Sequence, residues 1–97
     1  MIDKRIVVDL TNIRTPLGVR QTVATSFGVP LGQEFTWDLL SALVRDAVRA
    51  AEPNHMTVSG LPKVGVNLPE EAAMVRRLLG DLTSWCPSLD IRVVLHD

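Results

Sequence analysis

Three short apolar runs, separated by segments with helical spacing, place the strongest constraint on what this chain can fold into. They lie at residues 5–10 (RIVVDL), 55–60 (HMTVSG) and 89–95 (LDIRVVL). Runs of this kind are typical of strands, and the first suits a strand that is buried on both faces. Strands that alternate with helices pair in parallel and are joined by right-handed crossovers. The sequence therefore predicts an α/β fold in which a three-stranded parallel sheet is covered by helices.

Capping residues and apolar spacing predict two helices between the first two runs. Thr15 offers an N-cap to the first, and Gly28 is a natural stop for it. Thr36 is the expected cap of the second, which ends at Glu52 because a residue that precedes a proline is disfavoured in helical geometry. The expected buried stripe of the second helix consists of Trp37, Leu40, Leu43, Val44, Ala47, Val48 and Ala51.

A further helix is predicted between the second and third runs. Pro69 suits its first position, Glu70 and Glu71 lie in its first turn, and Pro87 ends it. Residues 61–68, with Pro62 and Gly65, are expected to form a loop with room for a short irregular turn. The apolar stripe of the helix consists of Val75, Leu78, Leu79, Leu82, Trp85 and Cys86.

Length and charge exclude several classes of protein. Ninety-seven residues make a single domain, 1–97, with one hydrophobic core. A net charge of -1 gives no basic footprint for direct binding to nucleic acid. No apolar run approaches the roughly 20 residues of a membrane span, and the stretch MIDKRIVVDL lacks an apolar region of the length that a signal peptide requires. One cysteine, Cys86, excludes an internal disulfide. We therefore expect a cytoplasmic protein.

The stretch 27–46 carries the candidate functional residues. It joins two predicted helices through a loop, and loops held between rigid elements often carry binding function. The loop places Glu34 and Asp38 near a helix N-terminus, with Phe35 and Trp37 beside them. Two carboxylates with aromatics favour a protein-binding face over a catalytic pocket. The alternative is that Asp38 only favours the positive end of its helix and that Trp37 only fills the core.

Catalytic signatures are absent from the sequence. There is no glycine-rich phosphate loop, nucleophile elbow or metal-ligand spacing. His55 and Ser59 would share one face of a strand, but nothing in the sequence orients the imidazole. Cys86 is expected to be a buried, inert thiol. Glu34 and Asp38 have no identifiable partner for acid–base chemistry. We therefore expect a protein that is not an enzyme and has no cofactor or metal.

The run NIRTPLGVRQTVATSFGVP at residues 12–30 resembles the barstar family, the intracellular inhibitors of barnase-like guanyl-specific ribonucleases. The match is gapless between Ile13 and Asp38, and the last strand matches again at Asp90–Ile91. The matching positions within the first segment are Ile13, Arg14, Gln21, Thr22, Pro30 and Asp38. The resemblance implies a three-stranded parallel sheet with helices.

The resemblance also implies a partner, a guanyl-specific ribonuclease. In the family, the second helix and the loop before it block the active site, and carboxylates replace the RNA phosphates through charge-assisted hydrogen bonds. The family's acidic residue in the first turn of that helix corresponds to Asp38. The partner-binding residues implied here are Leu31, Gly32, Gln33, Glu34, Phe35, Thr36, Trp37, Asp38, Ser41, Ala42, Arg45 and Asp46.

The sequence departs from the family pattern within this region. Ala42 occupies the place of the main inhibitory aspartate, Ser41 that of an aromatic, and Gly32 and Gln33 those of two loop tyrosines. A shifted alignment would instead put the key aspartate at Asp38, at the cost of a gap. Both registers retain Asp38.

The missing aspartate predicts weak binding to barnase and better binding to a less basic nuclease of the same class. Asp46, one turn beyond Ala42, would extend the acidic stripe. Two alternatives stay open. The first alternative is a barstar-like protein-binding module with a non-nuclease partner. The second is a small enzyme that uses Asp38, Glu34 or His55.

Overall fold

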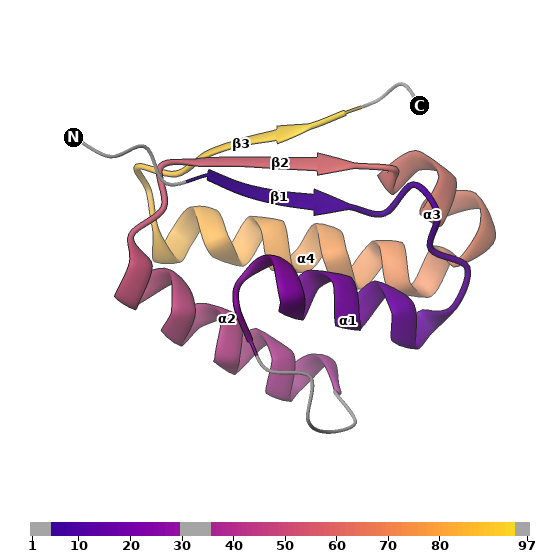
Figure 1. Ribbon diagram of the computed structural model, residues 1–97, viewed down its shortest axis with the longest axis horizontal. Coiled ribbons are helices and arrows are strands. Elements are labelled where there is room, and N and C mark those ends of the chain that lie inside the picture. The colour runs from indigo at the N-terminus through magenta and orange to yellow at the C-terminus, as the bar shows by residue number, and fades with distance from the viewer. Residues whose placement is uncertain (1–4, 30–35, 95–97) are drawn as a thin grey trace.

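The computed structural model describes residues 5–29 and 36–94 and shows a sheet with helices along one side (Figure 1). The elements in chain order are β1 (Arg5–Asp9), α1 (Pro16–Ser26), α2 (Trp37–Ala51), β2 (His55–Ser59), α3 (Leu61–Asn67), α4 (Pro69–Trp85) and β3 (Asp90–Val93). All three strands are parallel, and β2 lies between β1 and β3. The α/β fold with a three-stranded parallel sheet that the sequence predicted is therefore confirmed.

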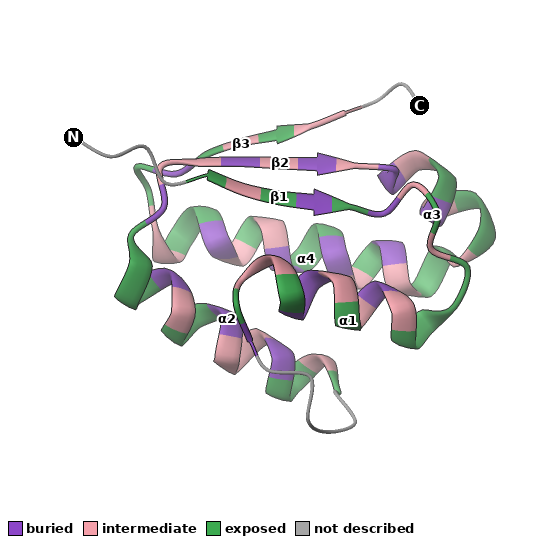
Figure 2. Ribbon diagram, in the orientation of Figure 1, coloured by how far each residue is buried: buried purple, intermediate pink, exposed green. Residues whose placement is uncertain are grey.

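The core lies between the inner face of the sheet and the helices (Figure 2). Helices α1 and α4 run beneath the sheet, and α2 packs against both of them (Figure 1). The largest fully buried hydrophobic side chains are Val8, Leu10, Val19, Val23, Leu40, Val44, Val48, Val58, Val64 and Leu82. They come from both strands and helices, so one core ties α2 to the rest of the domain.

Strand β1 is buried on one face only, so the expectation that it is buried on both faces was wrong. Val8 is 1% exposed, whereas its neighbour Val7 is 62% exposed. Side chains alternate between the two faces of a strand, and α1, α2 and α4 all lie on the same side of the sheet (Figure 1). Parallel sheets usually have both faces covered. Here the outer face is open in the described part of the chain.

Residues 61–68 were expected to form a loop, and this expectation was also wrong. Leu61–Asn67 form α3, with Pro62 in the first turn, where proline is tolerated. Gly60 precedes the helix with φ of 79°, a left-handed conformation that favours glycine. A Cβ atom at this position would lie only 2.7 Å from the Cα of Thr11. Gly60 therefore lets α3 begin close against the chain that leaves β1.

The predicted ends of the other helices hold in the structure. The side chain of Thr15 caps α1 by accepting a hydrogen bond from the N–H of Gly18 at 3.0 Å. Gly28 follows α1 with φ of 74°, and Glu52 ends α2 with φ of 49°. The prediction that Ala51 belongs to the buried stripe of α2 was wrong, because Ala51 is exposed in the last turn. The expected end of the last strand at Leu95 lies outside the described residues.

Candidate functional site on helix α2

The start of α2 is fixed by the cap that the sequence predicted. The Oγ1 atom of Thr36 accepts a hydrogen bond from the N–H of Leu39 at 3.2 Å. This bond satisfies one of the N–H groups that a helix leaves unpaired at its N-terminus. Asp38 lies in the first turn and is exposed, at the end of the helix where negative charge is favoured.

Replacing Thr36 by alanine should therefore destabilise the protein. Loss of an N-cap hydroxyl costs about 0.5–2 kcal/mol, and the free energy of unfolding in urea should fall by that amount. Thr36→Ser keeps the hydroxyl and serves as the matched control. Equal stabilities of the alanine and serine variants would show that the cap contributes nothing.

Trp37 joins α2 to two other helices. Its Nε1 atom donates a hydrogen bond to Oε2 of Glu71, in the first turn of α4, at 2.5 Å. The other carboxylate oxygen of Glu71 lies 3.6 Å from Nη2 of Arg20 on α1. The Arg20 and Glu71 side chains are only 21% and 15% exposed. This contact chain anchors the first turn of α2, so Asp38 is presented from a rigid support.

Four residues of α2 form one continuous face beside the buried stripe. Asp38, Ser41, Ala42 and Arg45 follow the i, i+3, i+4, i+7 spacing that places side chains on one side of a helix. Asp46 extends this face by one more position after Ala42. We call Asp38, Ser41, Ala42, Arg45 and Asp46 the α2 surface. All five are exposed or half-buried, whereas the stripe Leu40, Val44 and Val48 is buried.

The α2 surface has little net charge. Asp38 and Asp46 are offset in part by Arg45, and Arg49 lies one turn beyond Arg45. None of these four side chains forms an ion pair with another described residue. The carboxylate of Asp38 is therefore not committed to a cation within the described part of the chain. The predicted partner residues Leu31, Gly32, Gln33, Glu34 and Phe35 lie outside the described residues.

The sequence suggested two roles for the first turn of α2, filling the core and binding a partner. The structure supports each role in a different residue. Trp37 is half-buried, packs against the core and binds Glu71, as the purely structural interpretation expected. Asp38 points out of the fold on an exposed position, as a binding residue must. The structure thus separates an anchor, Trp37, from a candidate contact residue, Asp38.

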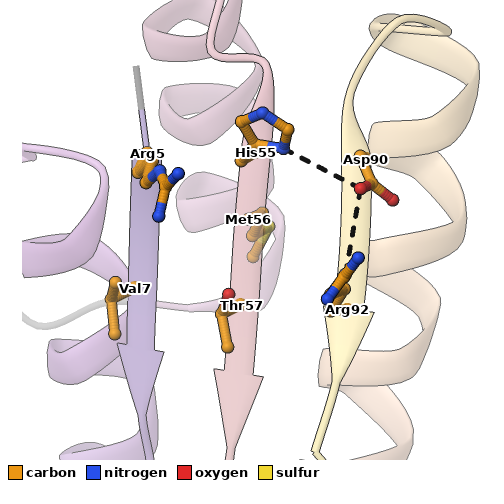
Figure 3. Close-up of a pocket in the computed structure, with 7 residues that line it drawn as sticks. All are labelled: Arg5, Val7, His55, Met56, Thr57, Asp90 and Arg92. Atoms are coloured by element: carbon orange, nitrogen blue, oxygen red, sulfur yellow. Dashed lines mark ion pairs between the residues drawn. The ribbon is translucent and has the colours of Figure 1, made fainter. Parts of the chain in front are cut away.

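The imidazole and hydroxyl considered for catalysis have different partners. Nδ1 of His55 lies 3.8 Å from a carboxylate oxygen of Asp90, which in turn lies 3.9 Å from Nε of Arg92 (Figure 3). Ser59 donates a hydrogen bond to Asp9 at 3.3 Å. These side chains lie on the open face of the sheet, where the carboxylate of Asp90 lies near His55 and Ser59 is bonded to Asp9. Cys86 is half-buried at the end of α4.

Two residues that support the site were not identified from the sequence. Glu71 was assigned only to the favourable start of its helix, and Arg20 was given no role. Glu71 is 34 positions from Trp37, so no local spacing links them. Only the packing of α1, α2 and α4 brings the three side chains together.

No family model, curated protein sequence or solved structure matches this chain. Among the described residues, no helix is both long enough and apolar enough to cross a bilayer. The same residues contain no cluster of three or more histidine, cysteine or acidic side chains that could hold a metal ion.

Proposed function

We propose that this protein inhibits a small secreted guanyl-specific ribonuclease by laying the start of α2 across its active site. The observation that carries the proposal is the exposed carboxylate of Asp38, held on a first turn that Thr36 caps and Trp37 anchors. A preorganised contact residue loses little conformational freedom on binding, which favours affinity. The gapless resemblance of residues 13–38 to the barstar family supports the same surface and the same class of partner.

The proposed chemistry is replacement of an RNA phosphate by a carboxylate. The active site of such a nuclease is cationic, because it binds a phosphodiester. Asp38 would accept charge-assisted hydrogen bonds from its arginine, lysine or histidine side chains. The protein would act in the cytoplasm of the cell that makes the nuclease, before the nuclease is exported. This role requires no cofactor, metal or chemistry of its own.

A second candidate is a barstar-like binding module whose partner is not a nuclease. Two observations favour it: Ala42 stands where the family has its main inhibitory aspartate, and Arg45 offsets much of the acidic charge of the α2 surface. A partner for this surface would rely more on apolar contact, for which half-buried Ala42 and exposed Leu39 are available.

The salt dependence of binding separates the two candidates. Inhibition through a carboxylate should weaken about tenfold or more between roughly 0.1 M and 1 M salt, because the Debye length falls from about 10 Å to about 3 Å. The measurement is the inhibition constant for a guanyl-specific ribonuclease across this range, with substrate cleavage by the nuclease alone as the control. An affinity that does not change with salt would favour the mainly apolar interface and contradict the carboxylate mechanism.

A further inference from the structure

A hollow lies beyond the carboxyl ends of β1 and β2, beside α3. It has a volume of about 360 Å³ and is lined by Thr11, Asn12, Ile13, Arg14, Lys63 and Asn67. The first four residues follow β1, and the last two belong to α3, which follows β2. The β1–α1 connection and α3 lie together at this end of the sheet in Figure 1.

The lining of this hollow is basic. Arg14 and Lys63 are exposed, and neither forms an ion pair with another described residue. The described residues of the lining include no carboxylate, and the amides of Asn12 and Asn67 add neutral hydrogen-bond donors. The two cations are 49 positions apart in the sequence and meet only because β1 pairs with β2. Net positive charge with convergent donors is the chemistry that recognises an anion.

The nearest acidic side chain along the chain is occupied by other contacts. Asp9 accepts hydrogen bonds from Oγ1 and the N–H of Thr11 at 2.6 and 3.0 Å, and from Ser59. The hydrogen bonds from the Thr11 side chain and backbone lower the pKa of Asp9, so it stays ionised at neutral pH. All three hydrogen bonds end on Oδ1 of Asp9, and Asp9 is not among the described residues that line the hollow.

The open face of the sheet offers an informative contrast. There, Arg5, His55 and Arg92 surround a hollow of about 270 Å³, but Asp90 lies between two of them (Figure 3). This carboxylate already occupies part of the space and charge that an anionic ligand would need. Basic side chains therefore line both hollows, and of these two the hollow beside α3 has no acidic side chain among its described lining residues.

We propose that the hollow between the β1–α1 connection and α3 binds the phosphate group of a small phosphorylated molecule through Arg14 and Lys63. A guanidinium fork and an ammonium group supply two positive charges and several N–H donors for a dianionic phosphate. The volume lies at the lower end of the roughly 300–1,000 Å³ typical of small-ligand sites. Ile13 is the one apolar side chain among the described lining residues, so the anionic group supplies most of the recognition. The site does not include the α2 surface, so this proposal does not depend on the inhibitory function.

The test is calorimetric titration of the whole protein with pyrophosphate. The protein should bind at one saturable site, and Arg14→Ala/Lys63→Ala should weaken binding at least about tenfold through loss of two charge-assisted contacts. Arg5→Ala/Arg92→Ala removes the same number of cations from the other hollow and should bind like the parent protein. Unchanged circular dichroism and thermal unfolding without ligand establish that each variant is folded. If the double variant fails this check, Lys63→Gln alone provides the same comparison.

Three results would overturn the proposal: no saturable binding of pyrophosphate, unchanged binding in Arg14→Ala/Lys63→Ala, or equal weakening in both double variants. The last result would mean that general surface charge, and not this hollow, attracts the anion. A short single-stranded RNA tested in parallel distinguishes the source of the phosphate. Tighter binding of that RNA than of pyrophosphate, lost in the Arg14 and Lys63 variant, would assign the hollow to nucleic acid and reject a small ligand.

Discussion

Replacing Asp38 by alanine is expected to weaken inhibition of the cognate ribonuclease by about 2–5 kcal/mol, or roughly thirty-fold to several thousand-fold. The loss is large because the cations of the nuclease would stay buried in the interface without their carboxylate partner. The measurement is the inhibition constant from RNA cleavage at fixed nuclease concentration. Because Asp38 is exposed in the free protein, the substitution should leave the free energy of unfolding within about 1 kcal/mol of the parent value.

Asp90→Ala is the matched control for this substitution. Asp90 is also an exposed aspartate, but it is the first residue of β3 and lies beside His55 and Arg92 on the open face of the sheet (Figure 3). The Asp90→Ala substitution removes the same charge without changing the α2 surface, so inhibition should be retained. If Asp38→Ala and Asp90→Ala inhibit equally well, Asp38 is not a contact residue.

Ala42→Asp decides between the two possible alignments with the barstar family. In the gapless register, it restores the family's main inhibitory carboxylate and should strengthen binding to a basic nuclease such as barnase. In the shifted register, Asp38 already fills that role, and a second carboxylate on the same face should bring little gain.

Leu82→Ala is expected to destabilise the protein by about 2–5 kcal/mol. Leu82 is fully buried on α4, in the core that the sheet shares with the helices. Truncation removes apolar contacts and leaves a cavity that close-packed neighbours fill only in part. A loss of this size is a large fraction of the stability of a small domain, about 5–15 kcal/mol in total. Urea unfolding monitored by circular dichroism measures it.

Leu17→Ala makes the same chemical change at a position of α1 that is 41% exposed. Its cost should be well below that of Leu82→Ala, because less apolar surface returns to water. Similar costs at the two positions would contradict the assignment of Leu82 to the packed centre of the fold.

The sequence predicted those parts of the fold that depend on local chemistry. Thr15 and Thr36 were recognised as caps because a hydroxyl at that position can accept a bond from the first turn, and both do so. The stripe Leu40, Val44 and Val48 was recognised from its spacing, and all three are buried. Parallel pairing followed from the alternation of strands and helices.

The errors arose where tertiary arrangement decides the outcome. The run that includes Val7 and Val8 is apolar at both positions, so its sequence does not reveal that helices cover only one face of the sheet. Gly60 and Pro62 are individually typical of loops. They permit α3 because one takes a positive φ and the other sits in the first turn.

The candidate site was predicted only in part for the same reason. Asp38 and Trp37 were identified from their place at the start of a helix, which is a local feature. The contact between Trp37 and Glu71 depends on the docking of α2 against α4, and the pairing of His55 with Asp90 depends on the register of β2 and β3. Neither long-range contact has a signature within one segment of the chain.

The proposed function is tested most directly by titrating this protein into several guanyl-specific microbial ribonucleases, including barnase, and following RNA cleavage. We predict complete inhibition at a one-to-one ratio for a less basic member of the class, with barnase inhibited far more weakly because Ala42 replaces the family aspartate. Failure to inhibit any member would contradict the ribonuclease-inhibitor function and leave the barstar-like binding module with a different partner as the better account.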